Sequence, residues 1–238
     1  YVDALGTELR HWGHLLERPL VGSIFFGGGT PSYIPERDTR YLADQIAESF
    51  AIAPGAEVTL EANPGDFDRT DPSSYLRAGF NRLSIGAQSF DDGLLRGLGR
   101  RHDAAGIELA VHKARAAGFD NLSLDLMFGL PDQTLAQWEA SLHRAIQLGP
   151  EHLSLYALTL EPGTPLEAAV RAGHSPEPDA DLAADMYLLA EDSLSSAGYL
   201  HYEISNWAVP GRPSVHNLAY WRCEPYLGVG PGAHSYIL

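Results

Sequence analysis

The sequence is poor in cysteine and in lysine. Among its 238 residues there is one cysteine, Cys223, and one lysine, Lys113, so the other basic residues are all arginines. A single cysteine excludes an internal disulfide framework and is typical of a reducing compartment, which predicts a cytoplasmic protein. We expect Cys223 itself to be buried as a small apolar side chain.

Long apolar runs and an excess of positive charge are also missing. No apolar stretch approaches the ~18 residues that a membrane-spanning helix needs, so we expect no membrane span. The net charge of −15 argues against nucleic acid as a partner, because a nucleic-acid groove requires a basic surface.

Common cofactor motifs are absent as well. Ten histidines are present, but the sequence contains no H-x-x-x-H pair and no C-x-x-C pair, so we predict no metal ligands within it. It also lacks the P-loop pattern and the G-x-G-x-x-G dinucleotide fingerprint.

Three consecutive glycines are the first feature that is present and unusual. Gly27, Gly28 and Gly29 follow an apolar run in "SIFFGGGTPS" and are soon followed by Pro31. Glycine in regular structure costs about 0.5–1 kcal/mol relative to alanine, so three in succession need a reason. The stretch forms either a tight turn or an edge where a small ligand lies against exposed backbone groups.

Apolar runs alternate with amphipathic stretches along most of the chain, which predicts an α/β fold with a parallel sheet. The predicted strands cover residues 23–26, 58–61, 82–85, 122–127 and 153–158. The predicted helices cover residues 1–17, 36–50, 72–78, 104–117, 134–148 and 179–197.

The unusual residues cluster directly after the predicted strands, in "GGGTP", "EANPGD", "GAQSF", "DLMFGLP" and "TLEPGTP". In parallel α/β folds the loops after the strands converge on the functional edge. A doubly wound sheet would place one or two such loops there, whereas five favour a barrel. We therefore predict a partial (β/α) barrel of the TIM type over residues 1–175. Residues 176–238, a helix followed by an aromatic and glycine-rich region with one strand, are predicted to begin a C-terminal extension.

Polar side chains end three of the predicted strands: Glu61, Gln88 and Asp125. Strand alternation directs Glu61 toward the mouth of the barrel. Asp125 lies between leucines and needs a partner, for which Arg100 and Arg101 are candidates. An acid, an amide and an arginine beside a glycine edge suit a zwitterionic, amino-acid-like ligand. An ion-pair network without a ligand, such as Glu61 with Arg100, produces the same pattern.

The stretch "HNLAYW", residues 216–221, combines an imidazole, an amide and two aromatic rings. A flat apolar ligand with a metal centre would use aromatic walls and one imidazole, here His216. Alternatively, Tyr220 and Trp221 only pack against the protein, and Asn217 caps a turn.

Six motifs together resemble the radical S-adenosylmethionine (SAM) proteins of the oxygen-independent coproporphyrinogen III oxidase group. In order they are "FFGGGTPS", "LEANP", "GFNRLSIGAQSFDD", "LGRRHD", "LDLMFGLPDQT" and "HLSLYALTLEPGTP", which span essentially the whole chain. The resemblance implies that the glycine edge receives the methionyl amino group of SAM. The cofactor contacts that it implies are Gly28, Gly29, Thr30, Glu61, Gln88, Arg100 and Asp125.

The "HNLAYW" stretch resembles the H-N-x-x-Y-W signature of the heme chaperone branch of this group. This resemblance implies heme binding and transfer of heme to membrane-associated respiratory-chain acceptor proteins, and no catalytic residue. The heme contacts that it implies are His216, Asn217, Tyr220 and Trp221.

Two other functions remain open. The first is a true oxidase that decarboxylates the propionate side chains of a porphyrinogen by radical hydrogen abstraction. The second is an unrelated barrel hydrolase or isomerase with Glu61 and Asp125 as an acid–base pair. It ranks last, because the sequence offers no nucleophile, histidine cluster or phosphate site.

The family also binds a four-iron, four-sulfur cluster through a C-x-x-x-C-x-x-C loop, which this sequence lacks. We therefore expect the cluster cysteines upstream of Tyr1 and an accessory domain after Leu238.

Overall fold

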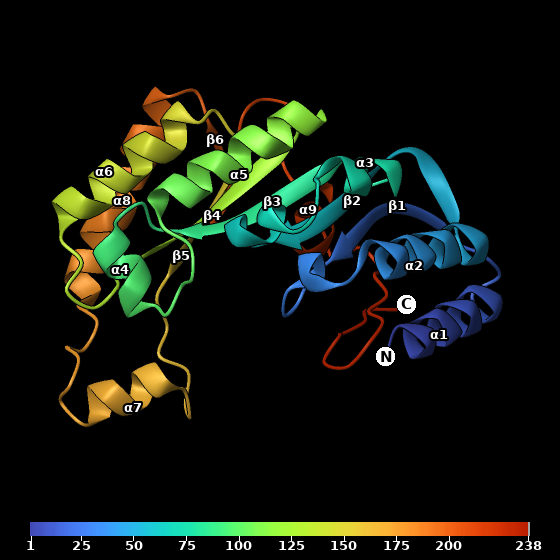
Figure 1. Cartoon of the computed structure of the whole chain (residues 1–238), viewed down its shortest axis with the longest axis horizontal. Helices are drawn as coiled ribbons and strands as arrows, with labels where there is room; N and C mark the ends of the chain where they lie inside the picture. Colours follow the sequence, from blue (N-terminus) through green and yellow to red (C-terminus); the bar gives the residue numbers. More distant parts are fainter. Residues whose placement is uncertain (238) are drawn as a thin grey trace.

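A curved, open sheet organises the computed structural model, which describes residues 1–237 (Figure 1). Its strand order is β1-β2-β3-β4-β5-β7-β6. The first five strands are parallel, and β7 and β6 continue the sheet as an antiparallel hairpin on β5. The strands are β1 (Leu20–Phe26), β2 (Ala51–Ala62), β3 (Arg82–Gln88), β4 (Leu122–Phe128), β5 (His152–Ala157), β6 (Leu200–Glu203) and β7 (Asn206–Ala208).

The predicted partial barrel is confirmed, because β1 and β6 lie at opposite edges of the sheet and do not pair with each other. All five predicted parallel strands form. The single strand expected in the C-terminal region is wrong in one respect: two short strands form a hairpin there.

Most of the helices connect the strands and cover the outer face of the sheet (Figure 1). Side-chain caps define several starts: the Asp103 carboxylate accepts a hydrogen bond from the Gly106 N–H at 2.8 Å, and Thr134 and Gln137 form a capping box. The helices are α1 (Val2–Leu15), α2 (Glu36–Ser49), α3 (Ser73–Arg77), α4 (Asp92–Gly97), α5 (Ala104–Ala117), α6 (Leu135–Gln147), α7 (Pro165–Arg171), α8 (Ala180–Ser196) and α9 (Val215–Trp221), with short 3-10 turns η1 (Pro31–Tyr33) and η2 (Pro64–Asp68).

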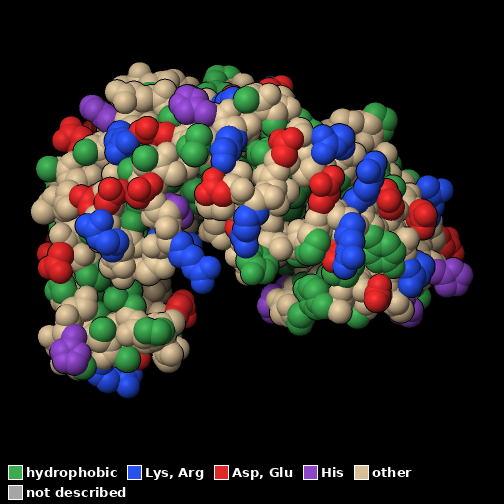
Figure 2. All heavy atoms as spheres, viewed as in Figure 1, with side chains coloured by type: hydrophobic (Ala, Val, Ile, Leu, Met, Phe, Trp, Pro, Cys, Tyr) green, Lys and Arg blue, Asp and Glu red, His purple; other side chains and the backbone are tan. Residues whose placement is uncertain are grey.

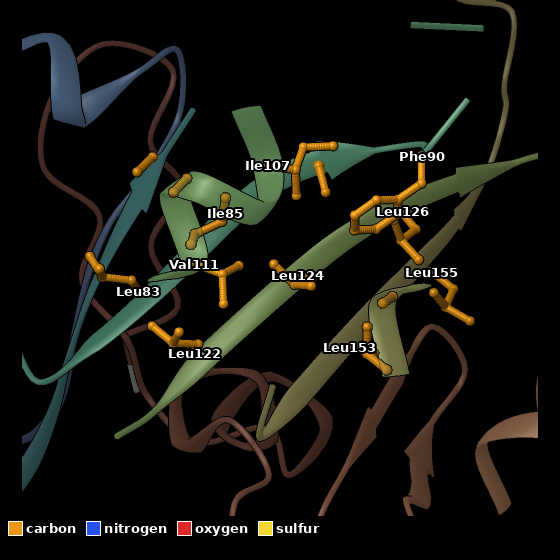
Figure 3. Close-up of a cluster of buried hydrophobic side chains, with 14 of the residues drawn as sticks. Leu83, Ile85, Phe90, Ile107, Val111, Leu122, Leu124, Leu126, Leu153 and Leu155 are labelled. Carbon is orange, nitrogen blue, oxygen red and sulfur yellow. The ribbon is translucent and has the colours of Figure 1, made fainter. Parts of the chain in front are cut away.

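The hydrophobic core lies between the outer face of the sheet and these helices. Leu83 and Ile85 of β3 and Leu122 and Leu124 of β4 form one buried cluster with Ile107 and Val111 of α5 (Figure 3). Leu83, Leu122 and Leu124 have no exposed surface. Full burial of one such side chain contributes about 1.5–3 kcal/mol, so this layer dominates the stability of the fold.

The C-terminal segments pack directly onto the barrel. Helix α8 packs against α6, where the Trp138 Nε1–H donates to the Met186 carbonyl at 2.7 Å. Helix α9 lies against β1, and α7 projects from the body (Figure 1). Within residues 1–237, every helix is too short or too polar to cross a lipid bilayer.

Candidate functional site

The inner face of the sheet is polar, in contrast to its leucine-rich outer face. Cross-strand register places Glu61, Ser84, Ser123 and His152 in one row. Paired residues of parallel strands share a face, so these side chains all alternate with the core leucines. A hollow separates the α7 end of the molecule from the α1 and α2 end (Figure 2). Polar groups on the concave side of such a sheet form a site for a charged ligand.

The glycine edge follows β1 and contacts Glu61. The Gly28 N–H donates to Glu61 Oε2 at 3.0 Å. A Cβ added at Gly27 would lie 2.5 Å from the Phe25 ring and 3.2 Å from Glu61 Cδ, so only glycine fits between them. Gly28 and Gly29 have φ of +73° and +67° and open space where a Cβ would be. The stretch is therefore a tight turn, and it also leaves a bare backbone ledge on its open side.

A second contact joins the ledge to the residue that follows β2. The Asn63 side chain donates to Thr30 Oγ1 at 3.2 Å. A Cβ at Gly86 would lie 2.8 Å from Gln88 Nε2 and 3.5 Å from Asn63 Oδ1, so both side-chain amides lie close to Gly86. Gln88 has φ +66°, which is uncommon for a residue other than glycine. Asn63 was missed as a site residue, although the "LEANP" motif contains it.

Asp125 on β4 is held by hydroxyl groups and not by the expected arginines. Ser84 Oγ donates to its two carboxylate oxygens at 2.9 and 3.0 Å, and Ser123 Oγ lies 3.3 Å from Oδ1. No ion pair joins Asp125 to Arg100 or Arg101 within the described residues, so that expected pairing is wrong. Burial raises the pKa of Asp125 despite these donors.

Glu61 and Asp125 are coupled electrostatically. Burial raises the pKa of Glu61, the negative charge of Asp125 raises it further, and the Gly28 N–H opposes the shift. Two desolvated carboxyl groups on the same face of the sheet favour a positively charged ligand, which would stabilise both in the ionised form.

Arg100 lies apart from this pair, in the loop after α4. It forms no ion pair with Glu61 in the described part of the chain, so the alternative of a simple Glu61–Arg100 pair is wrong. Burial lowers the pKa of Arg100. The structure thus brings Gly28, Glu61 and Asp125 together, and it places Asn63 beside Thr30 and Gln88 beside Gly86. Among the described residues, no hydrogen bond or ion pair joins Arg100 to this group.

Helix α9 holds the "HNLAYW" residues, and its first turn is fixed by Glu57 of β2. The Glu57 carboxylate accepts hydrogen bonds from Ser214 Oγ, the Val215 N–H and the His216 N–H, each at 3.1 Å. Arg82 Nε lies 3.9 Å from Glu57, and both side chains are buried. Sequence reasoning missed Glu57, because its partners lie more than 150 positions away.

His216 is engaged at both ring nitrogens. Its Nδ1 lies 3.4 Å from Ser23 Oγ, its Nε2 lies 3.1 Å from Tyr220 Oη, and its ring stacks on Phe25 at 4.9 Å. Burial lowers the pKa of His216, which keeps the imidazole neutral and therefore able to coordinate a metal.

The other expected residues of α9 differ in exposure and role. Tyr220 and Trp221 are 44% and 54% exposed, so Trp221 is not simply packed. Asn217 does not cap the helix: Ser214 Oγ accepts from its N–H at 3.3 Å, and the Asn217 amide lies 3.4 Å from Tyr202 Oη. Cys223 is exposed, so the expectation that it is buried is wrong.

Of the three cofactors that the resemblance implies, SAM and heme suit the residues of this chain and the iron–sulfur cluster does not. A glycine ledge with paired carboxyl groups fits an amino-acid-like cation, and a neutral imidazole beside exposed aromatic rings fits a metalloporphyrin. An iron–sulfur cluster does not fit the described residues. They contain one exposed cysteine and no group of three His, Cys, Asp or Glu side chains that could hold a metal ion.

Comparison with known proteins defines the class. Residues 8–145 match the family model of the radical SAM superfamily. This match covers more than half of the chain, and the chain belongs to that superfamily.

Individual relatives have more specific names than the superfamily. The chain is 40% identical to the heme chaperone HemW of Synechocystis sp., over 100% of this chain and 57% of that protein. It is 42% identical to the heme chaperone HemW of Escherichia coli, over 100% of this chain and 62% of that protein. It is 44% identical to the mitochondrial radical S-adenosyl methionine domain-containing protein 1 of Mus musculus, over 98% of this chain and 53% of that protein. The chain thus spans between about half and two thirds of the length of these relatives.

A solved structure supports the same fold. Coproporphyrinogen III oxidase (HemN) from Escherichia coli, a radical SAM enzyme, superposes with a TM-score of 0.82 at 28% identity. The superposition covers 100% of this chain and 57% of that protein. The archaeal Elp3 of Methanocaldococcus infernus shares the fold with a TM-score of 0.63 at 16% identity.

Proposed function

We propose that the whole protein is a cytoplasmic heme chaperone that binds heme and passes it to membrane-associated respiratory-chain acceptor proteins. In this proposal SAM binds at the strand ends of the barrel. A 4Fe-4S cluster is held by cysteines outside the 238 residues. The observation that carries the proposal is helix α9, whose neutral His216 and exposed Tyr220 and Trp221 lie on the polar inner face of a chain about 40% identical to HemW proteins.

The strand-end residues support SAM as the ligand. The ammonium and sulfonium groups of SAM are both positive, and Glu61 and Asp125 are the desolvated carboxyl groups that would receive that charge. The space beside Gly28 and Gly29 is open where a Cβ would lie, and Thr30 follows them in sequence. Arg100, partly buried and without an ion-pair partner among residues 1–237, is suited to a ligand carboxylate.

The α9 residues support heme as the second ligand. A porphyrin is flat and apolar, and it suits the exposed ring faces of Tyr220 and Trp221. His216 is the iron ligand in this proposal. Its Nε2 lies 3.1 Å from Tyr220 Oη, so iron coordination at this atom requires the tyrosine hydroxyl to move away. Asn217 lies beside the site through its bond to Tyr202.

A second candidate function is oxygen-independent oxidation of coproporphyrinogen III. The observation that favours it is the TM-score of 0.82 with the E. coli oxidase. We rank it second, because the curated relatives with 40% and 42% identity over the whole chain are named heme chaperones.

The test separates these two functions in the full-length protein, purified and assayed without oxygen after cluster reconstitution. We expect it to bind heme, seen as a shifted Soret band, and to transfer heme to membranes that contain heme-free respiratory oxidase. We expect no conversion of coproporphyrinogen III. Conversion at enzymatic rates would overturn the chaperone proposal, and so would failure to bind heme.

A further inference from the structure

A continuous chain of hydrogen bonds crosses the inner face from Asp125 to helix α9. Ser123 Oγ lies 3.3 Å from Asp125 Oδ1 and 2.8 Å from His152 Nδ1. His152 Nε2 lies 2.7 Å from Tyr202 Oη. The Ser214 N–H and the Asn217 amide then donate to the same tyrosine oxygen at 3.3 and 3.4 Å.

We propose that His152 and Tyr202 are positioning residues that couple the Asp125 end of the inner face to helix α9. A cationic ligand at Asp125 thereby holds α9 more firmly in place. The identity of the two ligands, SAM at Asp125 and heme at α9, rests on the proposed function. The coupling itself rests on the series of hydrogen bonds between Asp125 and α9.

The donor and the acceptor of each hydrogen bond in this series can be assigned, starting from α9. A backbone N–H can only donate, so Ser214 forces the Tyr202 oxygen to act as its acceptor. The Asn217 amide donates to the same oxygen, so both of its acceptor positions are used and its hydroxyl proton goes to His152 Nε2, the one acceptor within hydrogen-bond distance of it among the described residues. His152 must therefore be neutral, with its proton on Nδ1.

The same assignment of donors and acceptors extends to the Asp125 carboxylate. The His152 Nδ1–H donates to Ser123 Oγ, and the single hydroxyl proton of Ser123 remains for Asp125. His152 is 1% exposed, and burial together with the charge of Arg82 keeps its pKa well below the ordinary range, which agrees with a neutral ring. Each donor between α9 and Asp125 therefore has one acceptor.

An ionised Asp125 is what this arrangement requires. If Asp125 became neutral, the Ser123 proton would be free to turn toward His152 Nδ1, and the histidine proton would move to Nε2. Tyr202 would then face donors from His152, Ser214 and Asn217 together, which weakens its bonds to α9. A positive ligand group near Asp125 keeps the carboxylate ionised and the α9 contacts intact.

The experiment measures hydrogen exchange of α9 amides in the full-length, cluster-reconstituted protein, with and without saturating SAM. The decisive variant is Tyr202→Phe, which removes the hydroxyl. The matched control is Tyr199→Phe, because the buried Tyr199 hydroxyl donates to the Pro150 carbonyl at 2.7 Å and takes no part in the chain. Ser123→Ala breaks the chain at its other end and serves as a second variant.

We expect SAM to slow exchange in α9 about fivefold in the wild type and in Tyr199→Phe, as expected for one strengthened hydrogen bond. We expect no effect of SAM in Tyr202→Phe, which still binds SAM, nor in Ser123→Ala at a SAM concentration that saturates that variant. The proposal is overturned if α9 exchange in the wild type ignores SAM, or if either variant responds as the wild type does. Absence of heme binding with an intact SAM effect would overturn the proposed function alone.

Discussion

The carboxylate of Glu57 accepts a hydrogen bond from the backbone N–H of His216 at 3.1 Å, although 159 positions separate the two residues in sequence. Glu57 belongs to β2, and Arg82 of β3 lies beside it. The negative charge of Glu57 at the first turn of α9 and the three donors of that turn fix the helix to the sheet. The position of His216 is therefore set by the barrel itself.

Replacing Glu57 tests this attachment. Glu57→Gln loses one acceptor oxygen and the charge opposite buried Arg82, so we expect the free energy of unfolding to fall by about 1–3 kcal/mol. Urea denaturation followed by circular dichroism measures the change. Glu139→Gln, at an exposed position of α6, is the control and should change the free energy by less than about 0.5 kcal/mol. Equal effects of the two substitutions would contradict the role of Glu57.

Gly27→Ala tests the fit of the glycine edge. The new Cβ would meet the Phe25 ring at 2.5 Å and displace the Glu61 carboxylate, so we expect SAM binding by the full-length protein to weaken at least tenfold, by about 1.4 kcal/mol or more. Equilibrium binding of SAM measures the effect. Gly22→Ala, on the same strand with no atom within 4 Å of the added Cβ, should bind SAM as the wild type does. Unchanged affinity in Gly27→Ala would show that Glu61 is not part of the SAM site.

Asp125 makes the stability of the protein depend on pH in a defined direction. Folding raises its pKa, so the folded state binds this proton more tightly than the unfolded state. The stability that this group contributes is present below its ordinary pKa and is lost as the pH rises through the raised value. Asp125→Asn removes this dependence, so the variant should gain stability relative to the wild type as the pH rises above the ordinary aspartate pKa of about 4. The gain is about 1.4 kcal/mol for each unit by which the pKa is raised.

Urea titrations of the wild type and Asp125→Asn across this pH range measure the difference. A difference that shrinks with rising pH would mean that Asp125 has a lowered pKa, and that the serine hydroxyls outweigh its burial.

Tyr220→Phe tests whether the tyrosine hydroxyl competes with heme iron for His216 Nε2. The tyrosine hydroxyl lies 3.1 Å from His216 Nε2, the atom proposed to bind iron. Removing that contact leaves Nε2 free, so we expect the full-length variant to bind heme about fivefold more tightly, the equivalent of one hydrogen bond. Heme titration followed at the Soret band measures it. Tyr33→Phe, at an exposed position of η1 where Arg69 covers the ring, should leave heme affinity unchanged. Weaker binding in Tyr220→Phe would mean that the hydroxyl itself contacts heme.

The barrel could be predicted from sequence because its signals are local. Apolar runs and helix caps repeat along the chain, and the loops after the strands contain the unusual residues. The β6–β7 hairpin could not be predicted in the same way. Its turn is Ile204-Ser205, which lacks the Asn-Gly or Asp-Gly signal that marks most two-residue hairpin turns.

Part of the strand-end site could also be predicted, because the alternation of side chains along a strand is a local signal. Alternation placed Glu61 on the inner face, where it meets Gly28. The partner of Asp125 was misassigned to arginines, because serine within a strand has no distinctive pattern. The true donors, Ser84 and Ser123, are found only through cross-strand register. The bonds from Glu57 to α9 likewise depend on tertiary contacts that no local pattern reveals.

The most direct test of the account is heme titration of the full-length His216→Ala variant, with His11→Ala at an exposed position of α1 as the control. The account predicts that His216→Ala lowers heme affinity at least tenfold while SAM affinity stays within twofold of the wild type, and that His11→Ala changes neither. Heme affinity in His216→Ala equal to that of the wild type would contradict the placement of heme at helix α9.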